Sequence, residues 1–350
     1  MKVSYTPYVL QFKRPGGTSR GVLTEKLTYI LKAEENNQVF LGECGLFKGL
    51  SADDVPEYET KLQWACNHFD KGLTFLWEEL RGFPSIQFGL EQLFQSIRMN
   101  LDNPDYTDPY NPDLYESAFK NGEKGIPING LIWMGDIDFM KKQIEEKLAQ
   151  GFHCLKLKIG VNWKEEYKIL KELREKYPAN KLELRVDANG GFSFEEAKTV
   201  LRQLKELSIH SIEQPIKKGQ IQEMKTLCVE SPTPIALDEE LIGVFHLDDK
   251  YALLQEIRPQ YIILKPSLVG GVRGSLEWID CCDALGIGFW ITSALESNIG
   301  LNAIAQWTAI LYPEMPQGLG TGGLFSNNFS SRLQVEKDQL YRKKIQNENN

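Results

Sequence analysis

The sequence lacks several features that would assign it to a common functional class. It has only four histidines, and its six cysteines form no C-x-x-C pair, so a zinc site is not expected. Its 40 Lys and Arg residues are outnumbered by 48 Asp and Glu residues, which argues against a nucleic-acid surface because such a surface needs a basic stripe. No apolar run approaches the roughly 20 residues that a membrane-spanning helix requires. The N-terminus also lacks the apolar core of a signal peptide, so we expect a cytoplasmic protein with reduced thiols.

What is present is the composition of an ordinary globular protein. Hydrophobic residues make up 42% and charged residues 25% of the 350 positions, which excludes wholesale disorder. A chain of this length suits two domains, or one α/β barrel with additions. Residues 4–13 and 27–43 are rich in strand formers, the second segment broken by a hairpin turn at "EENNQ". Residues 56–101 follow a helical period, and residues 103–113 have the Pro, Asp and Asn content of a loop.

From about residue 125 onward, short apolar runs alternate with amphipathic helices. A capping box, Ser193 with Glu196 three residues later, predicts the start of one of these helices. This alternation indicates a parallel sheet with crossover helices. About eight strand candidates fall between residues 125 and 323, which favours a closed barrel, with an open sheet as the alternative.

Charged residues fall near the C-terminal ends of five separate predicted strands. Successive members are 25 to 29 residues apart, the length of one βα unit: Lys158, Asp187, Glu213, Asp238 and Lys265. This end of a parallel α/β barrel carries the catalytic groups. Ordinary surface charges would fall mainly in the helices instead, so we interpret these five residues as a candidate active site.

The three carboxylates of this set predict a metal site. Asp187, Glu213 and Asp238 would converge from neighbouring strands and repel one another unless a cation lay between them. Strand parity favours Asp238 over Glu239, because it places Asp238 and Glu240 on one face and Glu239 on the other. Oxygen ligands that leave room for water and substrate suit Mg²⁺ best, with Mn²⁺ as a substitute. The alternative is a neutralised network of lysines and carboxylates inside the barrel.

A divalent ion beside lysines suits the removal of a proton alpha to a carboxylate. The metal would neutralise the anion that forms, and a lysine with a lowered pKa would act as the base. The run "FHCLKLKIG" supplies two lysines, Lys156 and Lys158, on one face of a strand. The competing interpretation is an edge strand whose lysines face solvent and discourage pairing with another sheet.

One motif points elsewhere. "GLGTGG" at residues 318–323 matches the spacing of a dinucleotide-binding loop. Such a loop should open a helix within a βαβ unit, and only 27 residues follow it. We predict a loop that closes the barrel mouth.

The chain resembles the enolase superfamily, in its muconate-lactonizing subgroup, through the runs "KLKIG", "RVDANGGF", "IEQPI", "ALDEEL", "LKPSLVGG" and "ITSALESNIG". The resemblance extends to "TSRGVL", "GECGLFKGLS" and "IPINGLIWMG" nearer the N-terminus. It implies an α/β fold, a modified (β/α) TIM-type barrel over residues 125–323. An α+β capping domain of residues 1–124 would be completed by the C-terminal tail, 324–350, whose end we expect to lack structure.

The same resemblance implies the roles of individual residues. Mg²⁺ would bind Asp187, Glu213 and Asp238, and the catalytic lysines would be Lys158 and Lys265, across the site from each other. The expected substrate-binding residues are Lys156, Arg185, Asn189, Ser293 and Arg20, the last in a cap loop that closes over the site.

Two reactions remain open within this subgroup, and a third reading is not enzymatic. The nearest likeness is to enzymes of menaquinone biosynthesis that dehydrate 2-succinyl-6-hydroxy-2,4-cyclohexadiene-1-carboxylate to 2-succinylbenzoate. The alternative is epimerisation of a dipeptide or racemisation of an N-succinylamino acid by the same lysine pair. An epimerase would need acids near the last strand to hold an ammonium group, and "MPQGLGTGGLF" has none. We therefore expect a small dicarboxylate substrate, while the oligomeric state stays open. A barrel kept only for binding would have lost one of the five charged residues.

Overall fold

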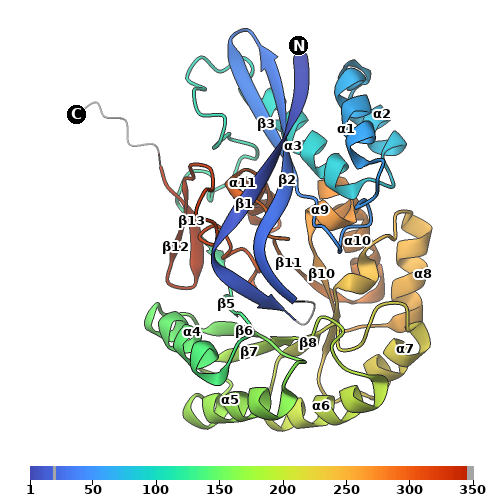
Figure 1. Cartoon of the computed structure of the whole chain (residues 1–350), viewed down its shortest axis with the longest axis vertical. Coiled ribbons are helices and arrows are strands. Elements are labelled where there is room, and N and C mark those ends of the chain that lie inside the picture. The colour runs from blue at the N-terminus through green and yellow to red at the C-terminus, as the bar shows by residue number, and fades with distance from the viewer. Residues whose placement is uncertain (19–20, 345–350) are drawn as a thin grey trace.

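A computed structural model of the chain describes residues 1–18 and 21–344. Its N-terminal part is an antiparallel sheet in the order β1-β2-β3, made by β1 (Lys2–Thr18), β2 (Gly21–Glu35) and β3 (Gln38–Cys44). β1 and β2 are longer than the sequence predicts and run from the cap down to the barrel (Figure 1). The predicted turn at "EENNQ" is confirmed: Asn36 and Asn37 have φ values of 50° and 63° and join β2 to β3. Asn is among the residues that adopt this left-handed conformation most readily, which explains the hairpin.

The helices of the cap pack on one face of this sheet. They are α1 (Tyr58–Asn67), a 3-10 turn (Phe69–Lys71), α2 (Leu73–Glu79) and α3 (Pro84–Asn100). α3 approaches β3 closely, since a Cβ on Gly42 would lie 2.2 Å from the carbonyl oxygen of Gly89. Only glycine allows this contact, and it lets apolar side chains such as Leu31, Phe40 and Leu90 bury completely between helix and sheet.

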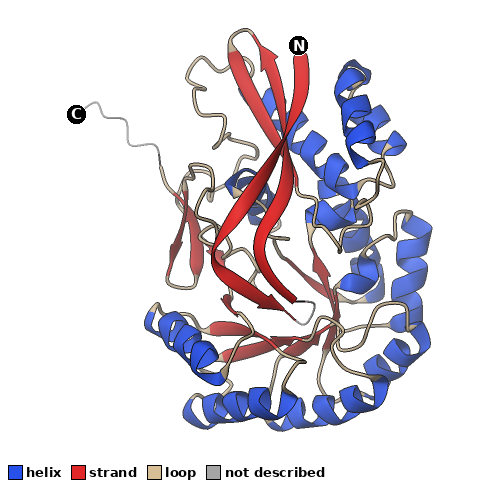
Figure 2. Ribbon diagram, viewed as in Figure 1, coloured by secondary structure: helices blue, strands red, loops and turns tan. Residues whose placement is uncertain are grey.

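The second part is a curled parallel sheet of seven strands in the order β11-β10-β9-β8-β7-β6-β5. The strands are β5 (Gly130–Ile132), β6 (Cys154–Lys158), β7 (Glu183–Asp187), β8 (Ser211–Glu213), β9 (Ile235–Leu237), β10 (Tyr261–Leu264) and β11 (Gly288–Ile291). The helices between and after them are α4 (Ile137–Ala149), α5 (Trp163–Lys176), α6 (Phe194–Glu206), α7 (Ile221–Glu230), α8 (Leu247–Ile257), α9 (Pro266–Val269), α10 (Gly271–Leu285) and α11 (Asn298–Ile310). α4 to α8 line the outer edge of the curl (Figure 2).

The local signals of these helices are confirmed where they can be checked. Ser193 caps α6 with its side chain, and Glu196 reaches back to the Ser193 N–H, which completes the capping box. Ala197, Val200, Leu201 and Leu204 are the buried side of that helix.

The eighth strand position of the expected barrel holds no regular strand in the described residues. Gln317 forms a parallel bridge to Ile128 and Gly318 one to Thr292, so this short segment joins both edges of the seven-stranded sheet. The Gln317 side chain adds to this closure by accepting a hydrogen bond from the Ile291 N–H at 2.7 Å. The "GLGTGG" motif belongs to this segment, which opens no helix and therefore does not match a dinucleotide-binding loop.

The six cysteines are free and buried. Within residues 1–18 and 21–344, no helix combines the length and apolarity needed to cross a membrane.

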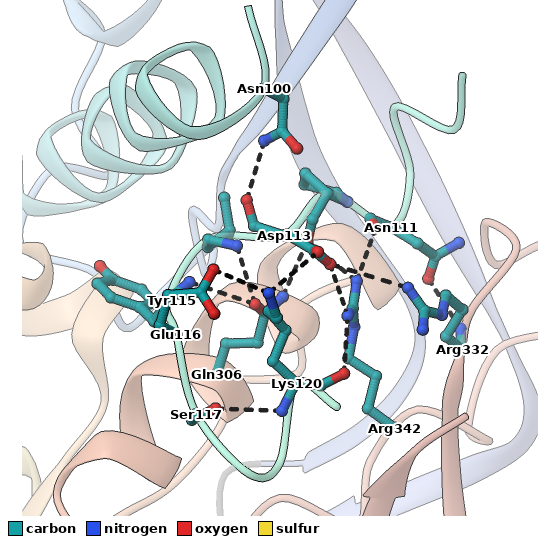
Figure 3. A network of polar contacts seen from close by, with 12 residues as sticks. Asn100, Asn111, Asp113, Tyr115, Glu116, Ser117, Lys120, Gln306, Arg332 and Arg342 are labelled. Atoms are coloured by element: carbon teal, nitrogen blue, oxygen red, sulfur yellow. Dashed lines mark hydrogen bonds and ion pairs between the residues drawn. The ribbon is translucent and has the colours of Figure 1, made fainter. Parts of the chain in front are cut away.

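The C-terminal segment returns to the linker between the two parts. β12 (Leu333–Glu336) and β13 (Gln339–Arg342) form a small antiparallel sheet with β4 (Ile126–Pro127). Figure 3 shows the polar network at the end of β13. The buried Arg342 guanidinium lies 2.7 Å from a carboxylate oxygen of Asp113 and donates to the backbone carbonyls of Asn111, Pro112 and Lys120. One arginine thus holds the loop of residues 111–120 in place.

Replacing Arg342 with methionine, which keeps much of the volume, should lower the free energy of unfolding by about 2 kcal/mol. The loss comes from several hydrogen bonds to a charged donor. Arg332→Met is the matched control: its guanidinium is 3.8 Å from Asp113 and more exposed, so its loss should stay below about 1 kcal/mol. Urea denaturation measures both, and equal losses would contradict the special position of Arg342.

Candidate active site

Three carboxylates meet at the C-terminal ends of adjacent strands. Asp187 and Glu213 end β7 and β8 and are paired in register, and Asp238 directly follows β9. One oxygen from each lies within 4.8 Å of the others, and all three side chains are buried. The predicted convergence of these residues is therefore observed.

The chemistry of this acidic triad fits a hard divalent cation. Glu213 Oε1 is buried and has no hydrogen-bond partner among the described residues. Burial raises the pKa of Glu213 to about 8 and the charges of Asp187 and Asp238 add to the rise, although Lys156 opposes it. A cation would relieve this repulsion and supply the missing partner. An all-oxygen donor set is the kind that Mg²⁺ prefers.

Two lysines lie directly beside the triad on β6. Lys156 Nζ is 2.8 Å from Glu213 Oε2, and Lys158 Nζ is 2.6 Å from Asp187 Oδ2 and 2.8 Å from Asn189 Oδ1. β6 lies between β5 and β7 in the sheet, so the alternative of an edge strand with solvated lysines is wrong. The two ammonium groups tolerate burial because carboxylates face them.

A third lysine faces the triad from the other side. Lys265 follows β10, and its Nζ lies 2.5 Å from Asp238 Oδ2. Because β6 and β10 are four places apart in the curled sheet, Lys158 and Lys265 lie across the site from each other.

These ion pairs set the pKa values in a direction that differs from our expectation for the lysines. Burial lowers the pKa of Lys265, but the charges of Asp238 and Glu239 outweigh it and the pKa is raised. Burial favours the neutral form of Asp187, but Lys158 and Lys156 hold its pKa well below the usual range. The pKa of Lys265 is therefore raised in this arrangement, whereas the lowered pKa was predicted for the lysine that acts as the base. A cation among the carboxylates would weaken their hold on the lysines.

A cavity opens beside the triad at Asp187. The cap contributes Thr18, Leu23, Phe47 and Leu50 to its wall, and the barrel contributes the remaining residues. Those are Asn129, Leu131, Trp133, Lys156, Lys158, Asp187, Lys265, Thr292, Ser293, Ala294, Leu295, Gly318, Gly320 and Thr321. Asp187 is the only Asp or Glu among the described residues of this wall, so the cavity is cationic apart from the triad.

The structure brings some of the predicted substrate-binding residues to the cavity and not others. Ser293 lines the cavity, with its hydroxyl 2.8 Å from Thr321 Oγ1. Asn189 lies beside Lys158 and donates to Glu239 Oε1 at 3.0 Å. Lys156 lines the cavity floor with Lys158. Arg20 lies outside the described residues.

Arg185 does not reach the cavity wall. It is completely buried one layer below Asp187, where it donates to Glu183 Oε1 and to the Pro316 carbonyl. Its guanidinium also stacks over Trp290, 4.5 Å from the ring centre. The prediction placed it on the correct face of β7, but the interior of a barrel is filled in layers and this residue lies in a deeper one.

The parity argument for the glutamates beside Asp238 is wrong. β9 ends at Leu237, and residues 239–241 form a 3-10 turn. Glu239 therefore turns toward Asn189, while Glu240 turns away and accepts hydrogen bonds from the Gly219 N–H and the Gln214 side chain. Asp238 still joins the triad because it comes before the turn.

The apolar wall of the cavity was missed as a set of site residues. Leu23, Leu50 and Trp133 cannot be distinguished from core residues in the sequence, because apolar side chains are commonly buried in any protein. Phe47 and Leu50 do fall within the run "GECGLFKGLS", which the resemblance had marked without a role.

Comparison with known proteins places this site in a family. The family model described as Enolase C-terminal domain-like matches residues 139–337, more than half of the chain. The chain belongs to the enolase superfamily.

Comparison with individual proteins shows which members of the superfamily the chain is similar to. The chain is 44% identical over 359 aligned residues to the o-succinylbenzoate synthase of Desulfotalea psychrophila, covering 96% of this chain and 97% of that protein. It is similar to the crystal structure of MenC from the same organism, with a TM-score of 0.81, 41% identity and coverage of 97% and 99%. The N-succinylamino acid racemase of Thermus thermophilus is 32% identical over 158 residues, which cover 45% of this chain and 40% of the racemase.

Proposed function

We propose that this chain is an o-succinylbenzoate synthase, a hydro-lyase that dehydrates 2-succinyl-6-hydroxy-2,4-cyclohexadiene-1-carboxylate to 2-succinylbenzoate in menaquinone biosynthesis. The observation that carries the proposal is the charge of the cavity: three lysines and, among its described residues, no carboxylate besides Asp187 of the triad. Such a cavity suits a substrate with two carboxylates and no amine. The 44% identity over nearly the full length of a synthase supports the same reaction. The six buried, free thiols agree with a cytoplasmic location.

In this proposal residues 1–124 and 324–350 form a cap over a barrel of residues 125–323. Asp187, Glu213 and Asp238 hold Mg²⁺, for which Mn²⁺ can substitute. When bound, the ion supplies positive charge to the substrate carboxylate next to the acidic carbon. The residues below do the remaining work.

Lys158 moves the proton. As the neutral amine it removes the proton alpha to the ring carboxylate, and the resulting ammonium then donates a proton to the departing hydroxyl on the same face. Water leaves, and the ring becomes aromatic. Lys158 lines the cavity, and the hydrogen bond to Asn189 Oδ1 at 2.8 Å helps to fix the position of its Nζ.

Lys265 acts from the opposite face through its charge. Its ammonium group lies across the planar anion and stabilises it, as a cation over a π-system does. Positive charge in a low-dielectric cavity stabilises the developing negative charge more than water would. Lys265 needs no proton transfer in this reaction.

The succinyl arm extends toward the loops after β11 and at residues 318–321. Ser293 and Thr321 offer hydroxyl groups there, and Thr18 and Leu23 of the cap cover the arm. The apolar side chains Leu23, Phe47 and Trp133 exclude water around it.

The second candidate function is racemisation of an N-succinylamino acid or epimerisation of a dipeptide. It is favoured by one observation, the pair Lys158 and Lys265 on opposite faces, which could each serve one enantiomer. A dipeptide would also present an ammonium group to a cationic cavity, so the N-succinylamino acid is the stronger form of this alternative.

The purified protein with Mg²⁺ should dehydrate the cyclohexadiene substrate at a kcat of about 1–10³ s⁻¹. The reaction is followed by the absorbance change as the ring becomes aromatic. N-succinylamino acids and dipeptides serve as competing substrates, with alpha-deuterium exchange as the readout. Faster exchange on either of these than dehydration of the cyclohexadiene would contradict the synthase assignment.

A further inference from the structure

A second group of buried charges lies outside the cavity, where the cap meets the barrel. We name Lys26, Glu43 and Glu296 the cap–barrel charge cluster. Lys26 is in β2, Glu43 in β3, and Glu296 in the loop between β11 and α11. Lys26 is 6% exposed and the two glutamates are 0% exposed, and none of the three lines the cavity. The proposed mechanism uses none of them.

Glu43 has a complete set of partners. It accepts hydrogen bonds from the Thr28 hydroxyl at 2.8 Å, from the Ser297 N–H and hydroxyl at 2.9 and 2.5 Å, and from the Gly300 N–H at 2.9 Å. The partners Ser297 and Gly300 belong to the start of α11, so Glu43 fixes that helix to the cap. Its role is structural.

Lys26 and Glu296 differ from Glu43 because each has an unused group. Lys26 Nζ and Glu296 Oε2 are buried and make no hydrogen bond to the described residues. Burial lowers the pKa of Lys26 and raises the pKa of Glu296, and in each case the opposite charge of the other residue counters the effect. Buried charges without hydrogen bonds are costly. An apolar pair of the same volume would often be at least as stable, so stability does not explain this one.

The barrel end of the pair reaches the segment that carries Lys265. Glu296 Oε1 accepts a hydrogen bond from the Ser267 hydroxyl at 2.5 Å, and Ser267 lies two residues after Lys265. The turn between them is closed by the Leu268 N–H, which donates to the Lys265 carbonyl at 2.8 Å. A Cβ on Gly45 would lie 3.0 Å from Glu296 Cγ and 3.1 Å from Ser267 Cβ, so the cap backbone packs directly on this contact.

The cap end of the pair reaches the cavity wall. Lys26 Nζ lies 5.7 Å from the ring centre of Phe47, which lines the cavity. Leu23, another wall residue, is three positions earlier in the same strand β2. Lys26 thus lies behind the part of the wall that the cap supplies, and Glu296 lies behind the part that carries the lysine.

We propose that Lys26 and Glu296 are positioning residues that hold the cap wall and the Lys265 segment in register through their opposite charges. The proposal rests on the proposed function of Lys265, which acts through its charge in the dehydration and as a base in the racemisation. Neither residue touches the substrate. They act through Ser267 and Phe47, and a displacement of about 1 Å at a reacting group is enough to lower a rate about 10²-fold.

A double-mutant cycle tests this pair. Lys26→Met and Glu296→Gln should each lower kcat about 10- to 100-fold, because each unbalances the buried charges of the cap–barrel charge cluster. The double variant Lys26→Met/Glu296→Gln restores the charge balance and should recover kcat to within about 5-fold of the wild type. Circular dichroism confirms that each variant is folded at the assay temperature. If Lys26→Met does not fold, Ser267→Ala, which removes a single hydroxyl, should lower kcat about 10-fold with an unchanged KM.

The control is another lysine–glutamate pair, made of a buried lysine and a partly exposed glutamate. Lys250 in α8 lies 2.7 Å from Glu277 in α10, is 1% exposed and does not line the cavity. Lys250→Met and Glu277→Gln should lower the free energy of unfolding but leave kcat unchanged. The positioning role is wrong if kcat of Lys26→Met or of Ser267→Ala stays within about 3-fold of the wild type. It is also wrong if the fold-loss in kcat of the double variant equals the product of the fold-losses of the two single variants.

The measurements are chosen so that the positioning role and the reaction assignment can fail independently. Exchange of the alpha proton with solvent deuterium is measured beside dehydration, on whichever substrate the wild type accepts. A wild type that racemises and does not dehydrate would overturn the synthase assignment, while the cycle could still be completed by exchange. A normal synthase with no coupling between Lys26 and Glu296 would overturn the positioning role alone.

Discussion

Replacing Lys158 with alanine should abolish both dehydration and exchange of the substrate's alpha proton with solvent deuterium. A general base contributes about 10²–10⁴-fold to the rate, and Lys158 also returns the proton to the leaving hydroxyl, so we expect a loss at the upper end of this range. The fold should survive, because Asp187, the carboxylate that loses Lys158, keeps Lys156 at 3.5 Å. Dehydration by Lys158→Ala at the wild-type rate would remove Lys158 from the reaction.

Lys265→Arg is the companion variant that separates the two reactions. In a dehydration with one base, guanidinium keeps the positive charge near the anion, so part of the activity should remain although the shape differs. In a racemase each lysine serves one enantiomer, so the same variant should lose exchange from one face entirely. Stereospecific deuterium exchange distinguishes these outcomes.

Replacing Glu213 with glutamine should lower turnover about 10³-fold or more and weaken Mg²⁺ binding. The metal contributes several kcal/mol of charge stabilisation, and each 1.4 kcal/mol corresponds to a factor of ten in rate. Asp187→Asn and Asp238→Asn should behave alike, because the three carboxylates share one ion. Titration calorimetry with Mg²⁺ measures the binding directly.

The control for the metal prediction is another buried glutamate close by. Glu240→Gln alters a side chain that bonds Gly219 and Gln214 and is not part of the triad, so Mg²⁺ binding should be retained. Wild-type protein treated with EDTA should be inactive until Mg²⁺ is returned. Full activity after EDTA treatment would rule out a metal-dependent reaction.

The sequence predicted the charged part of the site well because each charge has a local signal. A parallel strand ends where its helix begins, and the strand ends of one sheet meet at one edge, so Asp187 and Glu213 could be placed without knowing the contacts. Face alternation also put Lys156 and Lys158 on the same side. The fold class followed from the alternation of strands and helices.

The failures share a different physical origin. Alternation gives the face of a strand and not the depth of a residue within a barrel, so Arg185 was placed at the substrate although it lies a layer below. The alternation of side chains between two faces also ends where the strand ends. Glu239 and Glu240 come after that point, so they were assigned to the wrong sides. The cap wall and the pair of Lys26 and Glu296 depend on contacts between parts of the chain that are far apart, and no local pattern reports them.

The irregular closure of the barrel at Gln317 and Gly318 has a consequence for how such an enzyme can change. Each of these residues forms a single bridge to its neighbouring edge, so the segment that follows is not part of any strand ladder. Gly320 lines the cavity there, and a Cβ on it would meet nothing closer than 3.5 Å. A new side chain can enter the cavity at that position while the seven-stranded sheet and the triad stay as they are. Substitutions in this segment can therefore change the substrate preference during evolution, while the residues that transfer the proton stay the same.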